Sequence, residues 1–217
     1  MALILAACAT APHPFRDAAA IEEQIAANFR DWPDDPDTFA RLSPGALARD
    51  GRTLTVRTGA RSFRFTDSGY CEGFMTCERY RADRIFHGRW LGITHVHGEY
   101  PNSYYIIDLN GGRRLFDTGV QPIPGPVAPL AALADAGEAN QPILGGLAVL
   151  DLERQRPLLH RPDLYLDARI EGWESAACVR ASHVADPARR DGERTTVWMA
   201  ASGDRWALFT QRPDVCG

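Results

Sequence analysis

Two kinds of hydrophobic spacing divide this chain. In residues 16–32, Ile21, Ile25 and Phe29 recur every four positions, which is the spacing of one face of an α-helix. After Pro44, short apolar segments alternate with turns at intervals of roughly 8–12 residues, as is typical of all-β folds. The pattern therefore predicts an all-β fold that follows a short N-terminal helix.

Several of the predicted strands show which kind of β architecture to expect. Arg52–Thr58 and Arg61–Asp67 flank Gly59-Ala60 and predict a hairpin. In Ser103–Leu109 and Leu147–Leu152, both alternating sets of residues are apolar, whereas an antiparallel sheet usually has one wet face. We therefore expect antiparallel four-stranded sheets in a small or open propeller-like arrangement, with a stacked β-sandwich as the alternative.

The segments between these strands carry further local signals. Residues 120–146 are rich in Pro, Ala and Gly and predict a long connection, with a short helix within Ala128–Ala136. Asp108 and Asp151 follow aliphatic residues in matching positions. We expect both carboxylates to close turns by accepting backbone N–H groups.

One stretch resembles a known family. Trp90-Leu91, Tyr104–Leu109, Gly111-Gly112 and Leu115 follow the order of conserved blade positions, and Asp50-Gly51 occupies a blade opening. In these positions the chain resembles the TolB-type, WD-repeat-like β-propellers of bacteria. The resemblance implies a binding or scaffolding role. A blade takes roughly 40–45 residues, so residues 44–217 have room for about four, which favours a small or open assembly.

The amino terminus carries a targeting signal. Leu5-Ala6-Ala7-Cys8 resembles a bacterial lipobox, where a signal peptide is cut and the cysteine is lipidated. The apolar stretch before it is short, so we expect the true start to lie upstream. The predicted organisation is a lipobox remnant and tether in residues 1–15, a helix and Pro-rich linker in 16–43, and one β-rich domain in 44–217.

The lipobox also predicts a location. A lipid on Cys8 would be the only contact with the membrane and would anchor a periplasm-facing protein in the cell envelope. In Gram-negative lipoproteins, an Asp directly after the lipidated cysteine is the usual signal for retention in the inner membrane. Here that residue is Ala9, which favours the outer membrane.

The remaining four cysteines fit an exported protein. An even number of cysteines outside the cytoplasm indicates two disulfides, and four cysteines allow three pairings. We favour Cys71–Cys77, which closes a compact loop, and Cys178–Cys216, which would attach the carboxyl-terminal tail to an inner strand. The spacing of these thiols does not match a zinc knuckle.

Charge and motifs narrow the function. The 24 basic residues, all Arg, face 28 acidic ones, and the net charge of −4 argues against a nucleic-acid-binding surface. The chain has no GxSxG, Walker-type, HExxH or GxGxxG motif. We expect a non-catalytic binding module without a cofactor, whose partner is another envelope protein or a small ligand. A purely structural envelope component is a further possibility.

One constellation supports an enzyme as the alternative. His95, His97 and Glu99 alternate along one segment, so on a strand their side chains point to the same face. Two imidazoles and a carboxylate could bind zinc or manganese and support metal-dependent catalysis. The competing interpretation is that the histidines only make hydrogen bonds within a blade.

Overall fold

The computed structural model describes residues 33–42, 45–67, 78–97, 100–111, 116–135, 144–164, 167–184 and 194–217. Within them lie one α-helix, α2 (Pro36–Arg41), one short 3-10 helix, η1 (Asp214–Cys216), and four antiparallel sheets. The prediction of an all-β fold with antiparallel sheets is therefore confirmed.

Each sheet is formed by strands that follow one another in the chain. Sheet A contains β1 (Leu47–Asp50), β2 (Thr53–Arg57) and β3 (Ser62–Thr66). Sheet B contains β4 (Glu78–Phe86), β5 (Trp90–His97), β6 (Tyr100–Asp108) and β7 (Phe116–Asp117). Sheet C contains β8 (Ile123–Pro124), β9 (Leu130–Asp135), β10 (Gly146–Asp151) and β11 (Arg156–Arg161). Sheet D contains β12 (Arg169–Ser175), β13 (Cys178–Val184), β14 (Arg194–Ser202) and β15 (Arg205–Phe209).

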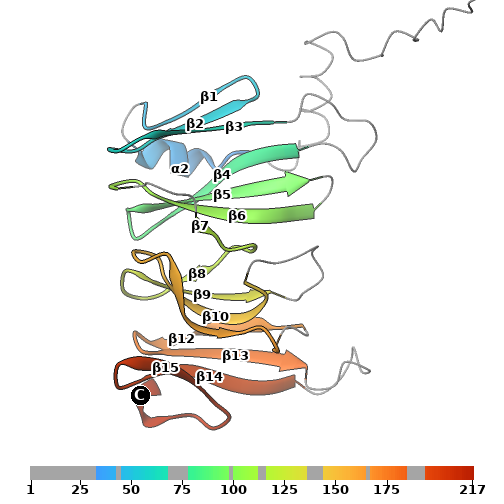
Figure 1. Ribbon diagram of the computed structural model, residues 1–217, viewed down its shortest axis with the longest axis vertical. Coiled ribbons are helices and arrows are strands. Elements are labelled where there is room, and N and C mark those ends of the chain that lie inside the picture. Colours follow the sequence, from blue (N-terminus) through green and yellow to red (C-terminus); the bar gives the residue numbers. More distant parts are fainter. Residues whose placement is uncertain are drawn as a thin grey trace, which may run out of the picture.

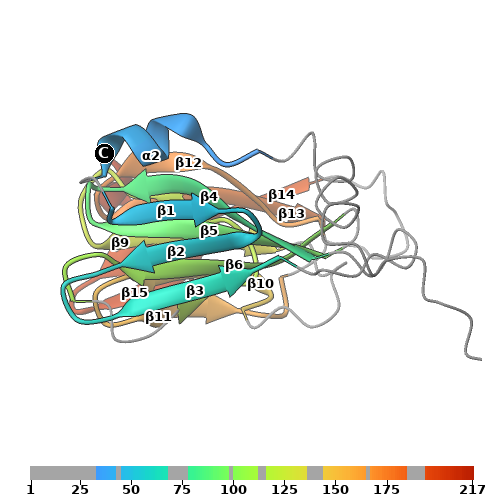
Figure 2. The same cartoon turned by 90° about the horizontal axis from the view of Figure 1, so that it is seen from above.

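The four sheets are stacked along the longest axis of the molecule, in chain order from A to D (Figure 1). Seen from above, their strands overlie one another and α2 lies on one side of the stack (Figure 2). The first and last sheets lie at opposite ends, so the stack is open.

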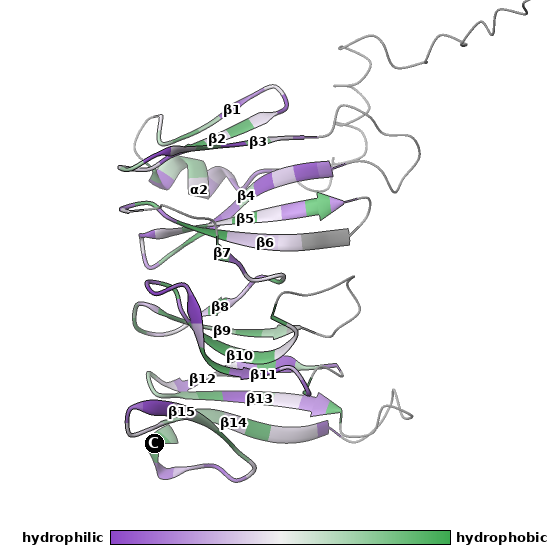
Figure 3. Ribbon diagram, in the orientation of Figure 1, coloured by the Kyte–Doolittle hydropathy of each residue, from purple (hydrophilic) through white to green (hydrophobic). Residues whose placement is uncertain are grey.

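Three hydrophobic cores hold the stack together, one at each interface. Sheets A and B enclose Leu54 and Ile107, sheets B and C enclose Ile106 and Leu150, and sheets C and D enclose Val149. The inner sheets therefore bury both faces, as the apolar alternation in β6 and β10 predicts. Hydrophobic residues colour much of β9 and β10 in Figure 3.

The predicted hairpin is present in sheet A. Val56 pairs with Phe63 and Leu54 with Phe65, which places these four side chains on the face toward sheet B. The two turn predictions are also confirmed. Asp108 Oδ1 accepts the backbone N–H of Asn110 at 3.0 Å, and Asp151 Oδ1 accepts that of Arg154 at 2.9 Å.

The predicted helix within Ala128–Ala136 is wrong, because this segment contains β9. The strand pairs with β10 from Leu130 to Asp135, and Ala131, Ala132 and Leu133 are fully buried. Alanine favours a helix by only a few tenths of a kcal/mol per residue. Pairing and burial between two apolar sheet faces outweigh that preference. Residues 120–146 therefore contribute two strands of sheet C as well as a connection.

The amino-terminal predictions lie largely outside the described residues. These include the tether in residues 1–15 and the helix in 16–32. The described part of residues 16–43 contains α2, in the segment where the sequence pattern predicts a Pro-rich linker. Asp35 caps this helix, Pro36 occupies its first turn, and Phe39 packs against the core between sheets A and B.

Candidate functional site

The outer edge of β4 is covered by acidic side chains instead of another strand. Asp67 Oδ1 accepts the backbone N–H of Tyr80 at 2.9 Å, and Asp34 Oδ1 accepts that of Ala82 at 2.9 Å. The backbone N–H of Asp35 donates to the Ala82 carbonyl at 3.0 Å. These bonds satisfy groups that would otherwise be open to a further strand. This part of β4 is therefore closed to strand addition.

Arg49 holds both of these carboxylates. Its Nη1 lies 3.0 Å from Asp67 Oδ2 and its Nη2 lies 3.1 Å from Asp34 Oδ1, and the guanidinium also donates to the Tyr80 carbonyl. Burial opposes the charge of Arg49, but the two carboxylates outweigh it and raise its pKa. Burial raises the pKa of Asp67, which is only 2% exposed, and neighbouring Asp34 adds to that rise. This charge cluster joins sheet A, sheet B and the segment before α2.

A cleft of ≈ 810 Å³ lies beside the cluster, bounded by α2, the second half of β4 and β8. Its walls combine apolar and charged side chains from three distant parts of the chain. The apolar ones are Pro33, Pro36, Ile85, Phe86, Pro124 and Pro126. The charged ones are Asp34, Asp35, Arg41, Arg81, Asp83 and Arg84.

The three carboxylates of the cleft are already engaged. Asp35 accepts the Thr38 hydroxyl at 2.6 Å and the Thr38 backbone N–H at 3.2 Å, and the hydroxyl bond is the main cause that lowers its pKa. Asp83 Oδ2 accepts the Tyr104 hydroxyl at 2.9 Å. Asp34 is held by Arg49 and the β4 edge.

Two of the three cations of the cleft are more available than its carboxylates, whereas the third, Arg81, lies 3.2 Å from Asp83 Oδ1. Arg84 is 50% exposed, and its Nε lies 3.6 Å from Asp83 Oδ2, which is beyond a normal hydrogen bond. Arg41 is exposed in the last turn of α2. An anionic group that enters the cleft would therefore find two guanidinium groups and a wall of prolines. The arrangement suits binding of an acidic ligand with an apolar body.

The two histidines that the sequence singles out lie on β5. His95 faces sheet A and is 7% exposed, whereas His97, on the same face of the strand, is exposed. The ring of Tyr80 lies flat against that of His95, with centroids 4.5 Å apart and planes 5° apart. Burial lowers the pKa of His95, which favours the neutral ring. Glu99 lies outside the described residues, so the predicted three-ligand set stays a prediction.

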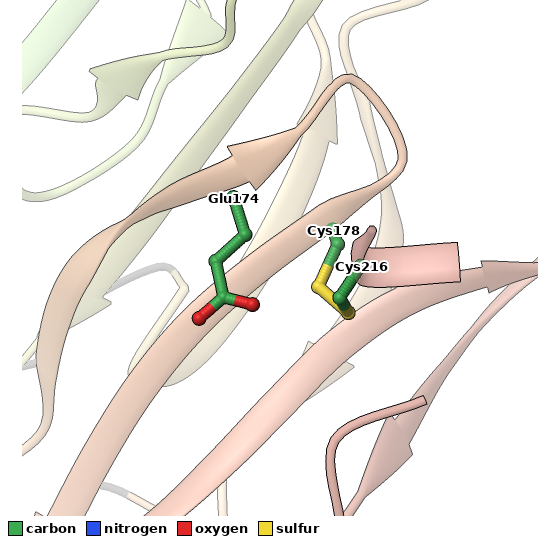
Figure 4. Close-up of side chains that lie close together, drawn as sticks. All are labelled: Glu174, Cys178 and Cys216. Carbon is green, nitrogen blue, oxygen red and sulfur yellow. A yellow bond between two sulfur atoms is a disulfide. The ribbon is translucent and has the colours of Figure 1, made fainter. Parts of the chain in front are cut away.

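The Cys178–Cys216 disulfide favoured by the sequence is present, and it joins β13 to η1. Glu174 lies beside it (Figure 4). Arg212 Nε lies 2.8 Å from Glu174 Oε2, and Arg212 Nη2 donates to the Cys216 carbonyl at 2.7 Å. The bridge and this arginine fix the carboxyl-terminal tail on the outer face of sheet D.

The metal-binding potential of this cysteine pair is removed by the disulfide. Among the described residues, one group of three possible ligands gathers within 4.8 Å, and it consists of Glu174, Cys178 and Cys216. Because the sulfurs are joined, neither is available as a thiolate. The other predicted cysteine sites lie outside the described residues: Cys8, Cys71 and Cys77.

Sequence reasoning missed Arg41, Arg49 and Arg84. The chain has 24 basic residues, all Arg, and no local pattern distinguishes Arg41 and Arg84, which border the cleft. Arg49 carried a weak signal, because strand alternation places it on the same inward face as Leu47. A charge at an inward position of a strand indicates a buried partner, but not which one.

In comparisons with known proteins, no family model, curated protein or solved structure matches the chain. The resemblance to TolB-type propellers therefore remains a prediction. In the part of the chain that the structure describes, no helix has the length and apolar character needed to cross a membrane.

Proposed function

We propose that this protein is a non-catalytic binding module of the bacterial cell envelope, and that it holds an acidic, extended segment of a partner protein in the cleft beside α2. The observation that carries the proposal is the state of the cleft's charges. Its carboxylates are occupied by fixed donors, while Arg41 and Arg84 extend into solvent. The charged groups that an incoming ligand can reach most easily are therefore these two guanidinium groups.

The apolar walls support a peptide as the ligand. A proline-rich, extended segment loses little backbone entropy on binding, because its polyproline II conformation is already formed, and its rings can pack on apolar walls. The volume of ≈ 810 Å³ falls within the usual range for ligand pockets. The guanidinium groups would then fix the position of acidic side chains by hydrogen bonds as well as by charge.

A binding assay tests this proposal. The probes are a fluorescein-labelled decapeptide of alternating Glu and Pro and its Lys-Pro counterpart. We expect the Glu-Pro peptide to bind preferentially, and the double variant Arg41→Glu/Arg84→Glu to weaken it at least about tenfold, with salt weakening it further.

The control for this assay is the double variant Arg156→Glu/Arg205→Glu, which changes two exposed arginines of sheets C and D by the same total charge. It should leave binding within about twofold, a difference well under 1 kcal/mol. Equal binding of both peptides, or equal loss in the control variant, would remove the cleft from consideration.

The envelope location is part of the same proposal. The Cys178–Cys216 disulfide supports it, because disulfides persist mainly outside the reducing cytoplasm. Lipidation of Cys8 would supply the anchor. Expressed with its native upstream sequence, the protein should partition into detergent, and Cys8→Ser should release it. Identical solubility of the two forms would contradict the anchor.

A metal-dependent enzyme is the second candidate function. It is favoured by the buried ring of His95, whose two nitrogens have no hydrogen-bond partner within the described residues. This function requires that the face of β5 that carries His95 and His97 bind a metal ion. Titration with Zn²⁺, described in the next subsection, tests this requirement.

A further inference from the structure

A row of polar side chains crosses the face of sheet B that is turned toward sheet A. Glu78 on β4 pairs directly with His97 on β5, and Tyr80 pairs with His95. Directly paired residues in an antiparallel sheet project from the same face. Glu78, His95 and His97 therefore share one face, at the end where β4 begins and β5 ends.

His95 is the residue of this row that most needs an explanation. Its side chain is 9% exposed, and both ring nitrogens are buried without a hydrogen-bond partner in the described part of the chain. Buried polar atoms almost always have a partner, because desolvation is otherwise uncompensated. The flat contact with Tyr80 also fixes the plane of the ring. The ring is thus held in place with its nitrogens unused.

We propose that Glu78, His95 and His97 bind a divalent transition-metal ion such as Zn²⁺. Glu78 Oε1 lies 4.0 Å from His95 Nε2. Two ligand atoms of a tetrahedral zinc site lie about 3.3 Å apart, given bonds of about 2.0–2.1 Å. The two atoms therefore need to approach each other by only about 0.7 Å.

Two of the three proposed ligands, Glu78 and His97, are exposed to solvent, whereas His95 is buried. The three ligand atoms are not all within 4.8 Å of one another in this structure. Glu78 is 39% exposed and His97 is exposed, so side-chain rotation can close the set around buried His95 without a change in the strands.

The donor set selects the class of metal. Two imidazoles and one carboxylate suit zinc, iron, cobalt or nickel, whereas calcium and magnesium prefer oxygen ligands only. The site differs from the sequence-based prediction in its carboxylate. Glu78 reaches His95 from the neighbouring strand, while Glu99 was chosen because it continues the alternation of β5.

Titration of the untagged, metal-free full chain with Zn²⁺ tests the site, with calorimetry as the readout. Co²⁺ is a second probe, because its visible absorption reports tetrahedral coordination. We expect one equivalent to bind, and Glu78→Gln and His97→Gln each to weaken binding at least about tenfold. Both positions are exposed, so the variants should keep the wild-type circular dichroism spectrum.

Matched controls separate this site from other ligands. Glu153→Gln and His87→Asn change an exposed carboxylate and an exposed histidine elsewhere, and should leave the affinity unchanged. Glu99→Gln tests the alternative carboxylate. Absence of binding to wild type, binding that survives both site variants, or loss in Glu99→Gln without loss in Glu78→Gln would each overturn the proposal.

Discussion

The two ends of the stack are closed in different ways. At the amino-terminal end, sheet A has three strands, and its outer face carries polar side chains such as Thr53, Thr55 and Arg64. At the carboxyl-terminal end, sheet D has four strands, and its outer face is covered by the tail that Cys178–Cys216 attaches. The amino-terminal end therefore has a polar outer face, whereas the carboxyl-terminal end is covered by a segment that a disulfide holds in place.

The two ends also differ in the interactions that attach them to the rest of the stack. Besides their hydrophobic core, sheets A and B are joined by the half-buried cation of Arg49 and two carboxylates. The tail on sheet D is instead held by a disulfide and by the more exposed pair between Arg212 and Glu174. In a stack, each sheet contacts only its neighbours. Damage at one end should therefore remain local, which hydrogen exchange can detect.

The largest effect is expected from Arg49→Met. The change leaves the carboxylates of Asp34 and Asp67 without the cation they share, and breaking one side of a buried ion pair costs about 3–5 kcal/mol. Urea unfolding should show this loss. Hydrogen exchange should increase in β1–β3 and at β4, and stay unchanged in β13 and β14.

Arg57→Met is the matched control in the same sheet. Arg57 is exposed on β2 and its guanidinium donates to the Gly45 carbonyl, so loss of this side chain should cost less than about 1 kcal/mol. If Arg49→Met costs no more than Arg57→Met, the charge cluster does not hold sheet A in place.

The disulfide should rank second. Removal of the bridge with Cys178→Ala/Cys216→Ala frees a loop closed across 38 residues and should cost about 3–4 kcal/mol in the chain-entropy picture. Exchange should increase in residues 212–217 and in sheet D, with sheet A unaffected. An equal increase in sheet A would contradict the local character of the two ends.

The smallest expected effect is a difference between Glu174 and Asp67 in how their protonation changes the free energy of unfolding. A bond from Arg212 lowers the pKa of Glu174, so its contribution to stability is present above about pH 4.5 and is lost as the pH falls further. Burial raises the pKa of Asp67, so the cost of its charge is relieved as the pH falls through that raised pKa.

Two isosteric variants, Glu174→Gln and Asp67→Asn, measure these two opposite dependences of stability on pH separately. As the pH falls from 6 to 3.5, the stability of wild type relative to Glu174→Gln should decrease, whereas its stability relative to Asp67→Asn should increase. Urea midpoints measured across this range give both slopes. Slopes of the same sign would show that the two ends do not differ in this way.

Much of the fold could be predicted because it depends on local patterns. The strands, the hairpin around Gly59-Ala60, the turns at Asp108 and Asp151 and the doubly buried strands β6 and β10 all follow from alternation and turn residues. β9 could not be predicted in this way, because its alanines favour a helix and only the neighbouring strands override them.

The candidate sites were less accessible from the sequence. His95 and His97 were identified because they are neighbours on one strand. The carboxylate beside them is Glu78, which lies 17 residues before His95 and reaches it through the pairing of β4 with β5. The cleft joins residues 33–41, 81–87 and 124–126, and no local pattern links these three segments.

By itself, the sequence determined that the chain forms short antiparallel strands whose inner members are covered on both faces, and it favoured Cys178–Cys216 among the possible cysteine pairs. These properties arise from the spacing of neighbouring residues and from a small number of possible pairings. Tertiary structure decided the open stack, the ion cluster around Arg49, the cleft and the approach of Glu78 to His95. These features depend on register and stacking between distant segments, and their energies arise only once those segments meet and exclude water.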